Sequence, residues 1–176
     1  MKSDGQSTRA TTVGITGHRA IPPAACRHVH AGLVTALRAA GHPNGADRRP
    51  LEVLSSLAIG ADQLFAEVAL AHGARLTAVL PSSDYEQTFD AGELVLFRRL
   101  LDRADRQIVM GHATVCDEAY YEAGTYIADH SDLVLAVWDG RPARGHGGTG
   151  EIVDYARRRG TPVSVIWKAG VVRDPA

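Results

Sequence analysis

The chain lacks the long apolar runs and the charge excess that mark several classes of protein. No run approaches the roughly 18 apolar residues of a membrane span, and residues 1–10 have no apolar core like that of a signal peptide. Lys and Arg total 19 against 20 Asp and Glu, so the formal charge of −1 gives no overall attraction to nucleic acid or anionic lipid. We therefore expect a cytoplasmic protein with no membrane partner, for which nucleic acid is an unfavoured partner.

Cysteine is also scarce. The two cysteines, Cys26 and Cys116, lie far apart and show no Cys-x-x-Cys or other ligand spacing. Free thiols fit a reducing compartment, and we expect no metal site and no cofactor. Two familiar phosphate signatures are missing as well, because the chain has neither the Gly-x-Gly-x-x-Gly dinucleotide fingerprint nor the Gly-Lys-Ser/Thr of a Walker A loop.

What the chain does have is an alternation of strand-like and helix-like segments. Hydrophobic residues make up 45% of its 176 residues, which is enough for one sizeable core. The apolar patterns predict strands at 11–16, 51–58, 76–80, 107–110, 133–138 and 162–167, and helices at 22–41, 63–72, 86–104, 117–131 and 149–160.

This alternation predicts an α/β fold. Parallel strands need crossover connections, so we expect a Rossmann-like, doubly wound, mostly parallel sheet of about six strands with helices on both faces. The domain should cover residues 11–168, between a disordered N-terminal tail at 1–10 and a C-terminal tail at 169–176.

The strongest functional signal is the glycine-rich loop between the strand at 133–138 and the helix that Thr149 opens. Gly147, Gly148 and Gly150 cost conformational entropy on ordering and add no packing, so they indicate either a very tight turn or a backbone cradle for phosphate. The N–H groups of a helix's first turn lack intrahelical partners and favour anions. We predict that Gly147, Gly148 and Thr149 bind a phosphate, with Thr149 also capping the helix.

Charged residues flank this loop. Asp139 ends the preceding strand and is a predicted ligand contact. Arg141 and Arg144 either fold over the phosphate or remain solvated. Glu151 has three open roles, which are to bind a ribose hydroxyl, to act on a glycosidic bond, or to favour the positive end of the helix.

A second candidate segment, Gly17-His18-Arg19, follows the first strand. A glycine there lets the backbone approach a ligand, and Arg19 has the geometry for two hydrogen bonds to a phosphate. The alternative is an ordinary strand-to-helix turn with an exposed arginine and His18 as a spacer. We predict that Gly17, His18 and Arg19 form the wall opposite the glycine-rich loop.

Two further strand ends complete the predicted site, since ligands of doubly wound sheets bind at the carboxyl ends of strands. Gly60, Ala61 and Asp62 follow the second strand, where Asp62 either accepts hydrogen bonds from a sugar or serves as a helix cap. Pro81 follows the third strand and is also a predicted contact. The nearby Tyr120, Tyr121 and Tyr126 are core residues or, for one of them, a stacking partner for a base.

Together these motifs resemble the SLOG superfamily, named for the DNA-processing Smf proteins and the LOG cytokinin-activating phosphoribohydrolases. The resemblance covers Thr12 to Trp167 and rests on residues 14–19, on 57–62 with 79–81 downstream, and on 131–134 leading to Gly147-Gly148-Thr149. It implies a Rossmann-like domain that binds a nucleotide or nucleotide-derived ligand with its phosphate on the Gly-Gly-Thr loop. LOG enzymes carry Pro-Gly-Gly-x-Gly-Thr-x-x-Glu, whereas Glu151 is only two residues beyond Thr149, a difference of about 100° around a helix.

We therefore expect a binding or sensing domain for a small-molecule nucleotide, either a nucleoside phosphate or an ADP-ribose-like compound. The rival hypothesis is an N-glycosidase that cleaves the base from nucleoside 5′-monophosphates, with Glu151 as the catalytic residue. A third hypothesis is single-stranded DNA binding, as in Smf proteins, which the near-neutral charge disfavours. A homo-oligomer could form through the apolar faces of the helices at 86–104 and 117–131.

Overall fold

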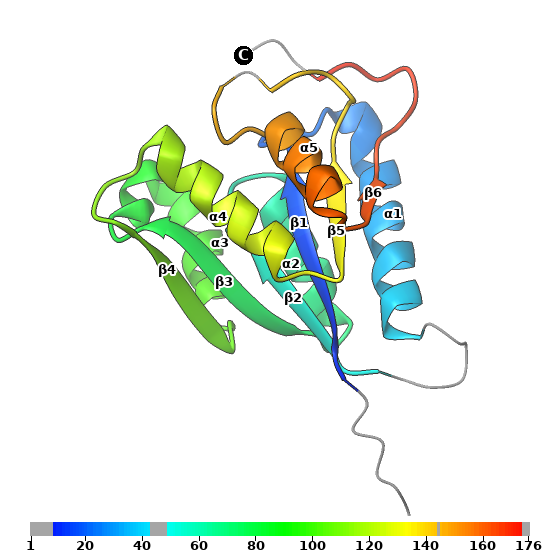
Figure 1. Ribbon diagram of the computed structural model, residues 1–176, viewed down its shortest axis with the longest axis horizontal. Helices are drawn as coiled ribbons and strands as arrows, with labels where there is room; N and C mark the ends of the chain where they lie inside the picture. The colour runs from blue at the N-terminus through cyan, green and yellow to red at the C-terminus, as the bar shows by residue number, and fades with distance from the viewer. Residues whose placement is uncertain (1–8, 43–48, 144, 174–176) are drawn as a thin grey trace, which may run out of the picture.

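The structure is a computed structural model that describes residues 9–42, 49–143 and 145–173. Its centre is a six-stranded sheet with the strand order β4-β3-β2-β1-β5-β6, in which every neighbouring pair is parallel (Figure 1). The strands are β1 (Thr11–Gly17), β2 (Leu51–Ser55), β3 (Arg75–Ser82), β4 (Arg106–His112), β5 (Leu133–Val137) and β6 (Val163–Val165). The predicted Rossmann-like α/β fold is confirmed, and the sheet is wholly parallel where the prediction was mostly parallel.

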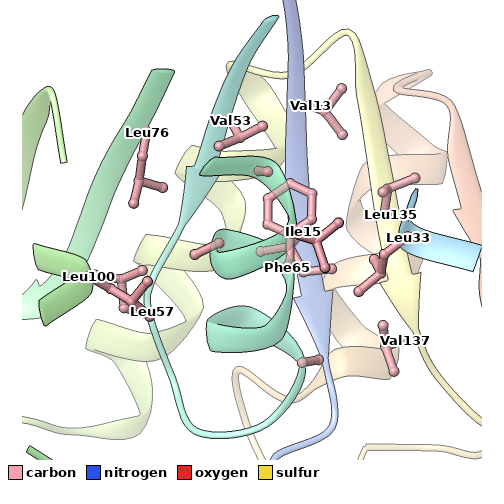
Figure 2. Packing of buried hydrophobic residues seen from close by; sticks show 14 of the residues in the cluster. Val13, Ile15, Leu33, Val53, Leu57, Phe65, Leu76, Leu100, Leu135 and Val137 are labelled. Carbon is pink, nitrogen blue, oxygen red and sulfur yellow. The ribbon is translucent and has the colours of Figure 1, made fainter. Parts of the chain in front are cut away.

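Helices cover both faces of this sheet. They are α1 (Pro23–Gly41), α2 (Ala61–Ala71), the short 3₁₀ helix η1 (Tyr85–Thr88), α3 (Ala91–Leu101), α4 (Asp117–Asp129) and α5 (Thr149–Arg159). On one face, Ile15 of β1 packs with Leu33 of α1 and Phe65 of α2, all at most 2% exposed (Figure 2). On the other face, Ile127 of α4 packs with Leu54 of β2 and Val79 of β3.

The strand order places a switch point between β1 and β5. From β1 the chain adds strands outward on one side as far as β4, then crosses through α4 to β5 and continues to β6 on the other side. The loops after β1 and β5 therefore leave the sheet in diverging directions and leave a crevice between them. Figure 1 shows the β5–α5 loop at the same end of the molecule as the last described residues.

One helix prediction was wrong. The segment predicted as a single helix from 86 to 104 is broken into η1 and α3, because Asp90 forms a capping box with Glu93. The Asp90 carboxylate accepts from the Glu93 N–H (2.8 Å), and the Glu93 carboxylate accepts from the Asp90 N–H (2.9 Å). Such a reciprocal pair satisfies N–H groups that the first turn of a helix leaves free, so a new helix begins there.

Several strand boundaries also differ from the prediction, and those of β2 and β3 have a clear local cause. β2 ends at Ser55 rather than at residue 58, because Leu57 has a left-handed φ of 55° and turns the chain away from the sheet. β3 extends through Pro81 to Ser82, with a shift in its pairing to β4 between Leu80 and Ser82. Proline has no N–H to donate to a neighbouring strand. A strand tolerates it where the pairing is already irregular, as it is here between β3 and the edge strand β4.

The described residues of the two predicted tails make specific contacts. Arg9, expected in a disordered N-terminal tail, pairs with Asp132 at 2.6 Å. In the C-terminal tail, the Val171 carbonyl accepts a hydrogen bond of 2.7 Å from the Trp167 indole N–H. The rest of the predicted tails, residues 1–8 and 174–176, lies outside the described residues.

Candidate functional site

A cavity of about 510 Å³ lies at the carboxyl ends of the strands, beside the switch point between β1 and β5. The loop after β1 forms one wall and the loop before α5 forms another. Residues of η1 and α4 contribute to it, and so does Arg173 beyond β6. It is of the size of an ordinary small-molecule site, and such sites in doubly wound sheets occur at this position.

The wall before α5 is shaped by Gly147, whose φ is 77°. A Cβ atom here would lie 2.8 Å from the backbone N of Tyr121, so the loop touches α4 too closely for any side chain. The Gly147 N–H donates to the Glu151 carboxylate (2.8 Å). This amide, predicted to bind phosphate, is therefore occupied by an acidic group of the protein itself.

The unpaired amides lie slightly further along the chain. Gly148 N–H donates to the Gly145 carbonyl (3.2 Å), and Gly148, not Thr149, is the N-cap of α5. In the part of the chain that the structure describes, the N–H groups of Thr149 and Gly150 and the hydroxyl of Thr149 have no hydrogen-bond partner. Thr149 lines the cavity, so its amide and hydroxyl are the donors available to an anion at the positive end of α5.

Glu151 fixes the shape of this loop. Besides Gly147, its carboxylate contacts His146 Nδ1 (3.1 Å), and His146 Nε2 lies 3.2 Å from Glu118 on α4. The His146 ring stacks on Tyr121 with 4.6 Å between ring centroids. Glu151 does not line this cavity; it lines a neighbouring cavity of about 550 Å³, together with Gly150 and Asp154.

The structure brings the segment Gly17-His18-Arg19 to the same cavity, where it forms a second wall. A Cβ atom on Gly17 would lie 2.4 Å from that of Ala61, so glycine allows β1 to approach the start of α2. Arg19 is exposed at the cavity, and no acidic partner for it occurs among the described residues. A guanidinium in this state is available to a phosphate.

Gly60 and Ala61 support this wall from behind and do not line the cavity. Gly60 has a φ of 90°, and a Cβ atom on it would lie 2.2 Å from the Arg19 carbonyl oxygen. The Ala61 N–H donates to the His18 carbonyl (3.1 Å). Both residues therefore position the backbone of His18 and Arg19.

Asp139 is buried behind the same wall, its side chain only 2% exposed. His18 Nε2 lies 3.0 Å from Asp139 Oδ1, and Arg173 Nε lies 3.3 Å from Asp139 Oδ2. Burial acts to raise the pKa of Asp139, but the hydrogen bond from the Arg141 N–H and the nearby His18 and Arg173 lower it overall. Asp139 is thus an ionised anchor that positions two cavity residues, and it does not itself line the cavity.

Asp62 lines the cavity at the start of α2 and is the most perturbed acid of the site. Its carboxylate accepts hydrogen bonds from the Ser55 hydroxyl (3.2 Å) and the Ser56 N–H (3.0 Å). Burial outweighs these bonds and raises the pKa of Asp62 from 3.8 to about 7. The left-handed Leu57 beside it creates the turn that aims the Ser56 amide at Asp62.

Aromatic and apolar side chains complete the cavity. Tyr85 of η1 and Tyr120 of α4 meet edge to face, with centroids 6.2 Å apart, and both line it. Burial and the nearby Asp62 raise the pKa of Tyr85, so its phenol is neutral. Ile127 and Ile152 add an apolar surface that suits a planar ring.

The structure thus divides the predicted contacts into three groups. Those at the cavity are Gly17, His18, Arg19, Asp62, Gly147, Gly148 and Thr149, and those away from it are Gly60, Ala61, Pro81, Asp139 and Glu151. Arg144 lies outside the described residues.

Sequence reasoning missed Tyr85 and Arg173 as cavity residues. Tyr85 lies four residues beyond the predicted contact Pro81, whereas nothing in the local sequence marks Arg173.

Two other kinds of feature are absent from the described residues. No group of three or more His, Cys, Asp or Glu side chains there could hold a metal ion. No helix in the described ranges is both long and apolar enough to cross a membrane. Cys26 and Cys116 are exposed and unpaired.

Comparisons with protein-family models and with curated proteins gave no match. Among solved structures, the chain is similar to DNA processing protein A from Streptococcus pneumoniae, with 19% identity and a TM-score of 0.61 over 89% of this chain and 50% of that one. The corresponding protein from Helicobacter pylori matches with 16% identity and a TM-score of 0.64 over 93% and 68%. The molybdenum cofactor binding protein from Rippkaea orientalis matches with 19% identity and a TM-score of 0.54 over 90% and 77%.

The chain spans half the length of the S. pneumoniae protein. At these identities the similarity shows a shared fold and no more. These matches confirm the Rossmann-like fold that the alternation of strands and helices predicted.

Proposed function

We propose that this domain binds a nucleotide or nucleotide-derived ligand, with a phosphate group between the start of α5 and Arg19. The observation that carries the proposal is that Thr149 and Arg19 line the same cavity, and that neither the donors of Thr149 nor the guanidinium of Arg19 has a partner among the described residues. The α5 dipole adds roughly half a positive charge at that end. A phosphate supplies the acceptors that these donors lack.

The remainder of the cavity suits a nucleoside. Tyr85, Tyr120 and Ile127 offer a ring-sized apolar surface, and Asp62 offers a carboxyl group for a sugar hydroxyl or a ring N–H. Proteins of the same fold are described as a molybdenum cofactor binding protein and as a single-stranded DNA binder. A small ligand is favoured over a strand of DNA, because the formal charge of the whole chain is −1 and gives no general attraction to a nucleic-acid backbone.

The test is titration calorimetry with AMP, ADP and ADP-ribose against the whole chain and a pair of matched variants. Thr149→Val removes the hydroxyl and keeps the shape, whereas Thr149→Ser keeps the hydroxyl. Loss of a hydrogen bond to a charged group is worth about 1.5–3 kcal/mol, or about 10–100-fold in affinity. Thr149→Val should bind that much more weakly and Thr149→Ser nearly as well as the wild type. Equal binding by the valine variant, or no binding by the wild type, would contradict the proposal.

A second candidate function, hydrolysis of the N-glycosidic bond of a nucleoside monophosphate, is favoured by Asp62. The sequence suggests Glu151 as the catalytic carboxylate of such an enzyme, but Glu151 accepts a hydrogen bond from the Gly147 N–H and does not line the cavity. Asp62 lines the cavity with a pKa of about 7, which suits an acid at neutral pH. Water would attack the sugar C1′ while the bond's electron pair leaves with the base nitrogen. Asp62 would protonate that nitrogen and regain a proton from the attacking water.

Release of free base from a panel of nucleoside monophosphates tests this second function. Asp62→Asn should abolish release, whereas Glu151→Gln should retain it if the loop keeps its shape. No release by the wild type, together with intact binding, would leave the domain as a binding module.

A further inference from the structure

Arg173 enters the cavity from a segment that sequence patterns identify only as a tail. It lies beyond β6 and lines the same cavity as Arg19 and Thr149. Its side chain is 13% exposed, which is low for an arginine near a chain end. The protein has therefore buried a cation at the site.

Two contacts hold Arg173 in place. Its Nε lies 3.3 Å from Asp139 Oδ2, and its Nη2 donates to the Pro142 carbonyl (2.8 Å). A guanidinium has five N–H groups in a fixed plane, so these contacts leave others available. Arg173 lines the cavity, and 13% of its side-chain surface is exposed.

The charges around the cavity do not cancel. Arg19 has no acidic partner among the described residues, and Arg173 shares Asp139 with His18. Glu151, the acid next to the glycine-rich loop, lies off the cavity and contacts His146. Asp62 is the acid that lines the cavity, and its raised pKa leaves it partly neutral near pH 7. The cavity therefore favours a ligand that carries more than one negative group.

We propose that Arg173 binds a second anionic group of the ligand, so that the domain prefers nucleoside diphosphates and diphosphate-linked nucleotides to monophosphates. This inference rests on the proposed function, because it assumes a first phosphate at Thr149. In this arrangement Thr149 and Arg19 hold one phosphate and Arg173 holds the other. Asp139 is a positioning residue that keeps the Arg173 guanidinium at the cavity.

The experiment compares affinities for AMP and ADP in the whole chain, each measured by calorimetry with the wild type and Arg173→Gln. The quantity compared is the ratio of the dissociation constants for AMP and ADP, because a general loss of structure weakens the binding of both ligands alike. In the wild type ADP should bind more tightly, and Arg173→Gln should reduce this preference about tenfold. Arg158→Gln, an exposed arginine at the far end of α5, should leave the ratio unchanged.

Arg173→Gln removes the ion pair to Asp139 Oδ2, a buried oxygen with no hydrogen-bond partner among the described residues, and this loss can unfold the chain. The double variant Asp139→Asn/Arg173→Gln removes both charges and is compared with Asp139→Asn alone. A preference for ADP that survives in the folded double variant overturns the role of Arg173. If AMP binding still falls in Thr149→Val in that case, the proposed function stands. If the wild type binds neither ligand, the proposed function itself has failed.

Discussion

Replacement of Asp62 by asparagine should change how the stability of the chain depends on pH. The Asp62 side chain is buried, and burial raises its pKa from 3.8 to about 7. Folding therefore favours the protonated carboxyl, and ionisation at higher pH opposes folding. Asparagine has the same shape, can accept from the Ser56 N–H, and does not ionise.

The direction of this pH dependence follows from the linkage between proton binding and folding. Between pH 3.8 and about pH 7, Asp62 carries a proton in the folded chain but not in the unfolded chain. The stabilisation that comes from this protonated carboxyl is therefore complete below about pH 4 and is lost as the pH rises through about 7. The whole shift corresponds to about 4 kcal/mol, at about 1.36 kcal/mol per pKa unit. About 2 kcal/mol of this loss falls between pH 5 and pH 7. The lowered pKa of Asp139 acts in the opposite sense, and its effect appears only as pH falls into the acid range.

Urea unfolding of the wild type and Asp62→Asn at pH 5, 6, 7 and 8 measures this effect. The free energy of unfolding of the variant minus that of the wild type should grow by about 2 kcal/mol from pH 5 to pH 7. Asp154→Asn, which alters an exposed acid on α5, serves as the control and should give a flat difference. A difference for Asp62→Asn that does not vary with pH would refute the reasoning, because it would mean that the carboxyl ionises normally in the fold.

Three further changes test how the site and its framework are built. Gly60→Ala places a Cβ atom 2.2 Å from the Arg19 carbonyl oxygen at a φ of 90°. It should lower the free energy of unfolding by more than about 1 kcal/mol and weaken AMP binding. Unaltered stability would contradict the geometry of this wall. Asp90→Ala removes the box with Glu93 and should cost about 1 kcal/mol in urea unfolding, with no loss of AMP affinity. Phe65→Ala empties a fully buried position between β1 and α2 and should cost about 3–5 kcal/mol, and a smaller value would indicate that the core collapses around the gap.

The Gly-Gly-Thr loop shows why a motif identifies a place more readily than the roles of its residues. The sequence places Gly147 and Thr149 at a helix start, and the structure has them there. Which amides are unpaired depends on a bond from the Gly147 N–H to Glu151, one turn further on. Glu151 in turn is held by His146, which contacts Glu118 on another helix. Contacts of this kind leave no periodic signal in the sequence.

The sequence by itself determined the order of strands and helices and the residues at the strand ends. This information is local, because apolar period, glycine and capping residues act within a few positions of one another. Even the wrong prediction of a single helix at 86–104 has a local cause, since the capping box of Asp90 and Glu93 is visible in the sequence. The Rossmann-like sheet follows from that order and from the handedness of parallel crossovers.

Only the tertiary structure decided which charged groups meet. Arg173 reaches Asp139 across 34 positions of the chain, and His18 reaches the same carboxylate from 121 positions away. The raised pKa of Asp62 likewise comes from its burial in the folded chain. Burial and charge pairing depend on distances between segments that are remote along the chain, and these distances exist only once the sheet has brought the ends of β1, β2 and β5 together.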